Sequence, residues 1–459
     1  MSDPRTLLSH PELRSQQSFP LFKTVGDRPK NALERGLSLF ADVRAGEGVG
    51  VVLLAVTVFL LLAGYYLLKT AREALILTEA GAEVKAYSSA AQAVLLLGAV
   101  PLYGWLSARV ARVPLLATTS LFFAANLVLF FTVGQAGARI GVLFYIWLGI
   151  FNVFVISQFW AFANDIYTEG QGRRLFPFIG VGSSLGAWIG AEASVPLVEQ
   201  LQAGPYSLMI VTAVLLIVCL AILVVVNRRE ATQNPETAAE GEQPLTGAGG
   251  FKLVFQDRYL IWIAVLVVLL NVVNSAGEFI LGKLVISEAA RQFAADDQLA
   301  DRQRFVGAFY GSFFGGVNLL GLLLQLFVTS RLMRHIGVRG TLFVLPVLAL
   351  VSYSVMAVAP ILAVVKVLKT LENSVDYSVN NTVRQALFLP TSRDAKYKAK
   401  AAIDTFFWRL GDVTQAGIVR AGTALGASVA VFAWFTVGLT ILWLWVAGQI
   451  AREHRRRTA

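Results

Sequence analysis

Long apolar segments alternate with short polar connections along nearly the whole chain after residue 49. Each segment has close to the roughly 20 apolar residues that a helix needs to cross the hydrocarbon core of a bilayer. The pattern therefore predicts an all-α polytopic membrane protein with twelve transmembrane helices. Their expected ranges are 50–77, 84–107, 113–134, 140–165, 175–201, 206–227, 258–286, 303–330, 338–358, 360–388, 399–422 and 427–450.

The polar segments between and around these helices predict five parts of the chain. They are a hydrophilic N-terminal segment (1–49), a first six-helix bundle (50–227), a linker (228–256), a second six-helix bundle (257–451) and a basic tail (452–459). The linker contains Pro, Glu and Gly, a composition typical of flexible connections. Nothing apolar precedes Val51, so we expect the first helix itself to direct insertion, without a cleavable signal peptide.

Two six-helix bundles joined by a linker resemble the major facilitator superfamily. The Arg-containing turns SARVARVP (107–114) and SRLMRHIGVR (330–339) follow the second and the eighth predicted helix. The halves therefore echo each other as a parallel repeat, which is typical of that superfamily.

The net charge of +10 is distributed unevenly across the predicted membrane. Basic residues lie at 109–112, 173–174, 331–339 and 384–400 and in the tail, whereas the connections 202–205, 359–360 and 423–426 have no Lys or Arg. Because cytoplasmic loops are enriched in Lys and Arg, we expect the linker and both termini in the cytoplasm of a bacterial-type inner membrane. The basic excess is then a topology signal, so we expect lipid but no nucleic acid as a partner.

The reactive side chains favour neither an enzyme nor a metalloprotein. Cys219 is the single cysteine and lies in an apolar segment, which excludes an intrachain disulfide and a Cys cluster for metal. His10, His335 and His454 lie in the terminal segments or a loop. The sequence has no recognisable nucleophile–base pair, so we expect a protein that is not an enzyme and needs no cofactor.

One glycine-containing stretch imitates a phosphate-binding loop. Gly277-x-x-x-x-Gly282-Lys283 has the spacing of that motif, but Leu284 stands where Ser or Thr would bind magnesium. The stretch also lies inside a predicted membrane helix rather than between a strand and a helix. Without a nucleotide-hydrolysis loop, transport by this chain would depend on solute gradients.

The segment 366–404 has the most informative polar pattern. On a continuous helix with about 100° per residue, its polar side chains share an arc of about 140°. They are Lys366, Lys369, Glu372, Asn373, Asp376, Tyr377, Asn380 and Arg384. Because a charge that faces lipid costs several kcal/mol, we expect this stripe to line a wet cavity inside the bundle.

Polar groups recur in other predicted helices. They are Tyr65, Lys69, Arg72 and Glu73 in the first, Gln158 and Asp165 in the fourth, and Asn271, Asn274, Ser275 and Glu278 in the seventh. Single charges of this kind can form structural ion pairs or reach the interface, but packing does not need so many of them. A cavity with Lys, Arg and compensating carboxylates suits an anionic solute. The row Gly182, Gly186 and Gly190 instead favours close helix packing.

Three segments resemble the nucleotide transporter (ATP/ADP translocase) family of intracellular bacteria and plastids. FWAFANDIYTEGQGRRLFPFIGVGSS (159–184) is similar to the family's FWGFANE…RFYPLFG pattern. RQALFLPTSRDAKYKAKAAID (384–404) is similar to its EMAYIPLD…KVKGKAAID pattern, and Lys69 stands like the Lys of its LKDT. The resemblance implies twelve helices and exchange of adenine nucleotides, or of a related nucleotide, by alternating access.

The resemblance also bears on the predicted site. Lys69, Asp165, Lys398 and Lys400 match charged family positions implicated in transport. Together with the polar pattern, this predicts nine substrate-binding residues: Lys69, Asp165, Glu278, Lys366, Lys369, Glu372, Asp376, Lys398 and Lys400. The lysines would attract phosphates, and the carboxylates would pair with the lysines when the site is empty.

Three positions depart from the family pattern. Thr70 stands where the family has Asp, and Asp165 where it has Glu. Asn274 occupies a position that is acidic in the family, unless Glu278 takes its place. These departures motivate a second hypothesis, an ion-coupled carrier of another organic or phosphorylated anion. A third hypothesis is a non-transporting membrane scaffold on a carrier fold. In each case we expect a monomer.

Overall fold

The computed structural model describes residues 30–38, 43–107, 110, 112–167, 169–200, 204–233, 250–293, 298–392, 395 and 399–458. All regular secondary structure in these residues is helical. The first half contains α1 (Ala32–Leu37), α2 (Gly48–Glu79), α3 (Gly81–Ser107), α4 (Arg112–Gln135), α5 (Gly141–Ile166), α6 (Glu169–Gln200), the 3-10 turn η2 (Gly204–Tyr206) and α7 (Ser207–Gln233). The second half contains α8 (Gly250–Gln256), α9 (Arg258–Gln292), α10 (Leu299–Leu324), α11 (Ser330–Thr341), α12 (Val344–Val358), α13 (Leu362–Val375), α14 (Asn381–Leu387), α15 (Lys400–Ala402), α16 (Trp408–Ala424) and α17 (Val429–Thr458). This half is interrupted by π-helical turns, among them η3 (Gln325–Thr329), η4 (Asp376–Asn380) and η6 (Ile403–Phe407).

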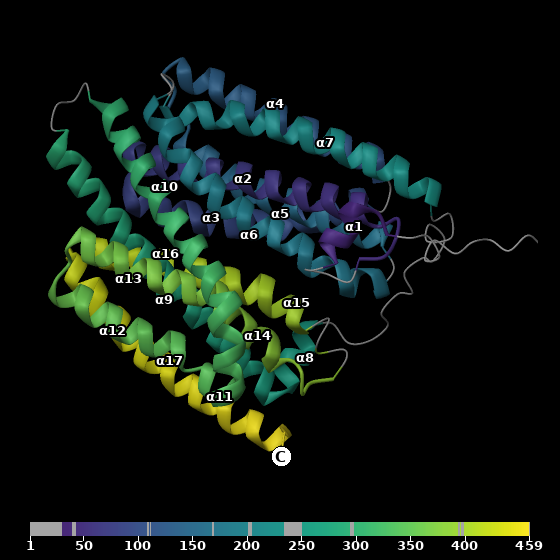
Figure 1. Ribbon diagram of the computed structural model, residues 1–459. Helices are drawn as coiled ribbons and strands as arrows, with labels where there is room; N and C mark the ends of the chain where they lie inside the picture. Colours follow the sequence, from purple (N-terminus) through teal and green to yellow (C-terminus); the bar gives the residue numbers. More distant parts are fainter. Residues whose placement is uncertain are drawn as a thin grey trace, which may run out of the picture.

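Buried apolar side chains form two clusters. One consists of residues between 43 and 226, with Phe144 and Phe159 among its largest members. The other consists mainly of residues between 254 and 450 and includes Phe313 and Trp443. Figure 1 shows the same division: α2 to α7, in purple to teal, lie above α12, α13 and α17, in green to yellow.

Close packing of α6 against α2 depends on the predicted glycine row. A Cβ atom added at Gly190 would come within 2.5 Å of the Cα of Ala63. Cβ atoms at Gly182 and Gly186 would collide with the carbonyl oxygens of Ala55 and Phe59. The interpretation of this row as a packing surface is confirmed, because only residues without a Cβ allow the two backbones to approach this closely.

Several helices of the two halves pack against each other. Helix α10 packs against α2 and α6, and α16 packs against α3. Asn318 of α10 donates a hydrogen bond to the carbonyl of Ala187 in α6, with an N–O distance of 3.2 Å. Lys283 of α9 forms an ion pair with Glu83 of α3. Polar side chains of both halves therefore face each other between the helix layers.

Helices lie within each of the twelve predicted ranges, with several differences. Among the described helices, seven are long and apolar enough to cross a membrane, so the count of twelve stays a prediction. The predicted tenth and eleventh helices are interrupted by η4 and η6. The range 338–358 is divided between α11 and α12, and the chain kinks at Gly337, whose φ of 67° is accessible to glycine without strain. The predicted linker begins with the end of α7 and finishes with α8.

Candidate functional site

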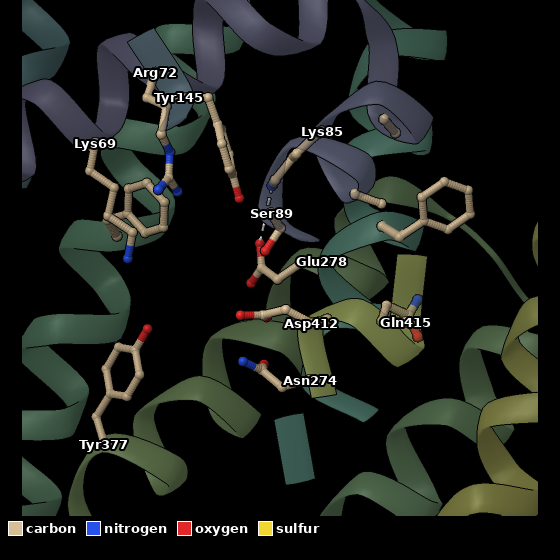
Figure 2. Close-up of a pocket in the computed structure, with 15 residues that line it drawn as sticks. Lys69, Arg72, Lys85, Ser89, Tyr145, Asn274, Glu278, Tyr377, Asp412 and Gln415 are labelled. Carbon is tan, nitrogen blue, oxygen red and sulfur yellow. Dashed lines mark ion pairs between the residues drawn. The ribbon is translucent and has the colours of Figure 1, made fainter. Parts of the chain in front are cut away.

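A cavity between the two halves contains most of the polar groups that face each other. It encloses about 740 Å³ of space free of protein atoms, including its open mouth. Its lining residues are Lys69, Arg72, Ala82, Lys85, Ala86, Ser89, Tyr145, Asn274, Ser275, Glu278, Phe279, Phe314, Tyr377, Asp412 and Gln415. We call it the charged cavity, and Figure 2 shows the cationic side chains of α2 and α3 opposite the carboxylates and amides of α9 and α16.

Two of the cations share one carboxylate. Glu73 forms ion pairs with Arg72 at 2.5 Å and with Lys85 at 2.6 Å. The Lys85 ammonium also lies 3.7 Å from Glu278, an ion pair that joins α3 of the first half to α9 of the second (Figure 2). Glu73 is buried, whereas the side chain of Glu278 is 22% exposed and lines the cavity. An incoming anion can therefore compete with Glu278 for Lys85.

Lys69 is surrounded by aromatic rings instead of carboxylates. Its ammonium lies 4.0 Å from the ring centre of Phe314, 5.0 Å from that of Tyr66 and 6.0 Å from that of Tyr377. These cation–π contacts hold the charge without neutralising it. Within the described residues Lys69 forms no ion pair, so its charge remains available to a ligand.

The polar side chains of α13 do not line the charged cavity; they contact residues that do. Lys369 is fully buried, lies 3.1 Å from Glu372 and donates to the Asn274 amide oxygen at 3.0 Å. Asn373 donates to Glu278 at 3.0 Å. Because Asn274 and Glu278 line the charged cavity, these contacts fix the orientation of two lining side chains.

The prediction that the whole stripe lines one cavity is wrong. Lys369 and Glu372 precede the π-helical turn η4 and already do not line the charged cavity, and η4 then interrupts the 100° phase from Asp376 onward. Tyr377 lines the charged cavity, whereas the buried Asp376 does not and instead accepts from Asn380 at 2.7 Å.

The other predicted site residues within the described part of the chain do not line the charged cavity. Lys366 donates to Ser312 at 2.7 Å, and Lys400 forms an ion pair with Asp404 at 2.8 Å. Asp165 is exposed at the end of α5. Lys398 lies outside the described residues. Of the nine predicted residues, the structure brings Lys69 and Glu278 into the cavity and sets Lys369 and Glu372 directly behind it.

Sequence reasoning missed Lys85, Asp412 and Gln415 as lining residues. Lys85 is near the predicted start of its helix, where a charge ordinarily reaches the interface. Asp412 lies within a predicted membrane helix, and it accepts from Asn271 at 3.0 Å and from Arg409 at 3.3 Å. A carboxylate well inside a predicted membrane helix is a usable signal for such a site.

The sequence of this chain is similar to those of known transport proteins. Residues 141–454 match a family model described as TLC ATP/ADP transporter. The ADP,ATP carrier protein 1 of Chlamydia trachomatis is 25% identical over 352 residues, which are 66% of this chain and 65% of that protein. The ADP,ATP carrier protein 4 of Rickettsia bellii is 21% identical over 351 residues, 66% of this chain and 65% of that protein. The chain thus spans slightly less than two thirds of the length of these relatives.

Solved structures share the fold. A mutant form of the nucleoside transporter NupG has a TM-score of 0.64 at 14% identity, with 87% of this chain and 99% of that chain covered. A POT family transporter crystallised with 5-aminolevulinic acid has a TM-score of 0.62 at 13% identity, with 88% and 96% covered. These similarities show that the chain shares the all-α fold of these transporters. Seven of the described helices are long and apolar enough to cross a membrane, in keeping with a multi-pass membrane protein.

Proposed function

The chain belongs to the TLC ATP/ADP transporter family, because the family model matches residues 141–454, and from this premise we propose that it exchanges nucleotides across a membrane by alternating access. ATP and ADP, or a related pair, are the proposed substrates. The names of the Chlamydia and Rickettsia relatives support this choice. The observation that carries the proposal is the charged cavity, in which three cations from α2 and α3 face the second half of the chain.

The cations have distinct proposed roles. Lys69 and Arg72 lie one helical turn apart on α2 and point toward the cavity together with Lys85 of α3 (Figure 2). Ammonium and guanidinium groups form charge-assisted hydrogen bonds with phosphate oxygens. Glu278 balances part of this positive charge when no nucleotide is bound, and the phosphates displace it from Lys85. The empty site thus avoids an excess of like charges.

The residues outside the charged cavity retain proposed roles at its approaches. Lys398 and Lys400 would collect nucleotides at the cytoplasmic mouth, and Asp165 lies at the end of α5, near the same predicted side. The bundles 50–227 and 257–451 are the proposed moving bodies. Positive loops support cytoplasmic termini in a bacterial-type inner membrane.

Counterflow in proteoliposomes tests this proposal. Vesicles loaded with unlabelled ADP and supplied with labelled ATP should accumulate label well above that in vesicles loaded with buffer alone. Uptake that ignores internal ADP would contradict exchange.

A second candidate is an ion-coupled carrier of another anion. Asn274, a neutral residue, lines the charged cavity where the family pattern is acidic. Thr70, also neutral, is buried and accepts from Ser194 of α6 at 3.2 Å. Uptake driven by a pH gradient, without any ADP-dependent counterflow, would favour this candidate over nucleotide exchange.

A further inference from the structure

A second cavity, lined by uncharged residues, lies next to the charged cavity and shares Tyr377 with it. It lies between α2, α6, α10 and the η4–α14 segment and encloses about 840 Å³ of space free of protein atoms, including its open mouth. None of its described lining residues carries a formal charge. Its polar and aromatic lining includes Ser183, Ser184, Asn318, Gln325, Tyr377 and Asn381. We call it the neutral cavity.

The two cavities share the described lining residue Tyr377. Tyr377 lines both of them, and its side chain is exposed enough to contact a ligand, with 45% of the residue accessible. The Lys69 ammonium lies on the charged side of this junction, 6.0 Å from the centre of the Tyr377 ring. A ligand that reaches from one cavity into the other therefore passes a cation and an aromatic face in succession.

The neutral cavity has unused hydrogen-bonding capacity. Within the described part of the chain, the hydroxyls of Ser183 and Ser184 and the amide of Asn381 form no side-chain hydrogen bond. Gln325 accepts from Thr382 through its amide oxygen at 3.3 Å, and its N–H groups donate no hydrogen bond to the described residues. Hydroxyl and amide groups offer donors and acceptors without charge.

From this division, and on the basis of the proposed function, we propose that the neutral cavity holds the nucleoside part of the substrate while the charged cavity holds its phosphates. Ribose hydroxyls and base edges need neutral donors and acceptors, which the serine and amide side chains supply. The base has flat faces that stack on aromatic rings, and Tyr377 presents one at the junction. Phosphates are excluded from the neutral cavity, because a buried charge without a partner is strongly unfavourable.

The rate at which single cysteines are labelled, with and without ligand, shows which cavity each part of the ligand occupies. With the buried Cys219 replaced by serine, a single cysteine is placed in the neutral cavity (Ser183→Cys or, independently, Ser184→Cys) or in the charged cavity (Ser89→Cys). The matched control is Ser120→Cys on α4, a partly buried serine that lines neither cavity. Reaction with a small maleimide is timed with no ligand, with ADP and with inorganic pyrophosphate.

The proposal predicts a distinct pattern. At a ligand concentration of ten times Kd about one site in ten is empty, so an occluded cysteine should react about tenfold more slowly. ADP should slow labelling in both cavities, pyrophosphate should slow it only at Ser89→Cys, and neither should affect Ser120→Cys. Protection by ADP at Ser89→Cys alone, or equal protection of the neutral cavity by pyrophosphate, would overturn the assignment while leaving nucleotide exchange in place. Protection by ADP at none of the positions would contradict nucleotide binding itself.

Discussion

The environment of Lys69 shows how a membrane protein can keep a cation ready for a ligand. A buried charge usually needs a carboxylate partner, but such a partner would compete with an anionic substrate. Three aromatic rings, with centres 4.0 to 6.0 Å from the Lys69 ammonium, stabilise this group without forming an ion pair with it. Arg72 and Lys85, in contrast, share Glu73. Lys69 is therefore the cation that phosphate groups should bind at the least cost.

Replacing Lys69 by alanine should weaken nucleotide binding strongly and leave the fold intact. Loss of one charge-assisted contact costs about 1.5–3 kcal/mol, which corresponds to a rise in KM for ADP of about 10- to 100-fold. Initial rates of exchange in proteoliposomes measure this effect. Lys252→Ala on α8 is the matched control, because Lys252 is exposed and lines neither cavity. Equal KM values for the two variants would exclude Lys69 from the site.

At this scale the sequence allowed part of the site to be predicted. Lys69 and Glu278 were identified because charges on the faces of apolar helices are costly unless they face water or a partner. Lys85 was missed, because a charge at the start of a helix is equally compatible with the interface. Its role depends on contacts with Glu73 and Glu278, which lie on two other helices. No local pattern contains that information.

At the scale of elements, hydrophobic spacing predicts where helices lie better than how they turn. A constant 100° per residue predicted one face for the polar residues of 366–384, but the π-helical turn η4 interrupts this phase from Asp376 onward. Tertiary packing also places Lys369 and Glu372, which precede η4, outside the lining of the cavity. The glycine row on α6 was predicted correctly, because the requirement for small side chains at close helix contacts is local. A π-turn depends on tertiary contacts and leaves no comparable pattern in the sequence.

Replacing one glycine of this row by a larger residue should disrupt the contact between α2 and α6. In Gly186→Leu the new side chain would collide with the Phe59 backbone, and overpacking of this kind typically costs about 1–3 kcal/mol. We expect a lower melting temperature in detergent and less folded protein in the membrane. Gly180→Leu on the same helix is the control, because no atom lies within 4 Å of a Cβ added there. Equal melting temperatures would show that the close contact does not limit stability.

At the scale of the whole molecule, the contacts between the halves must break and re-form if the cavity is to open on alternate sides. The ion pairs Lys283–Glu83 and Lys85–Glu278 both connect α9 with α3. Glu47–Arg174, at 2.8 Å, connects the start of α2 with α6 inside the first half. Movement of one half against the other would separate the first two pairs and leave the third unchanged.

Crosslinking distinguishes these two kinds of contact. With Cys219 replaced by serine, the pair Glu83→Cys and Lys283→Cys joined by a bifunctional thiol reagent should stop exchange, and cleavage of the linker should restore it. The pair Glu47→Cys and Arg174→Cys, joined in the same way, should leave exchange active. Continued exchange after complete crosslinking of Glu83→Cys to Lys283→Cys would contradict movement of the halves at this contact.

The position of a bound nucleotide tests the central claim most directly. An experimental structure of the full chain in lipid nanodiscs with saturating ADP should show the phosphates within hydrogen-bonding distance of Lys69, Arg72 or Lys85, with Glu278 withdrawn from Lys85. ADP bound outside the cavity between the two halves, or a cavity that stays empty at saturating ADP, would contradict the account.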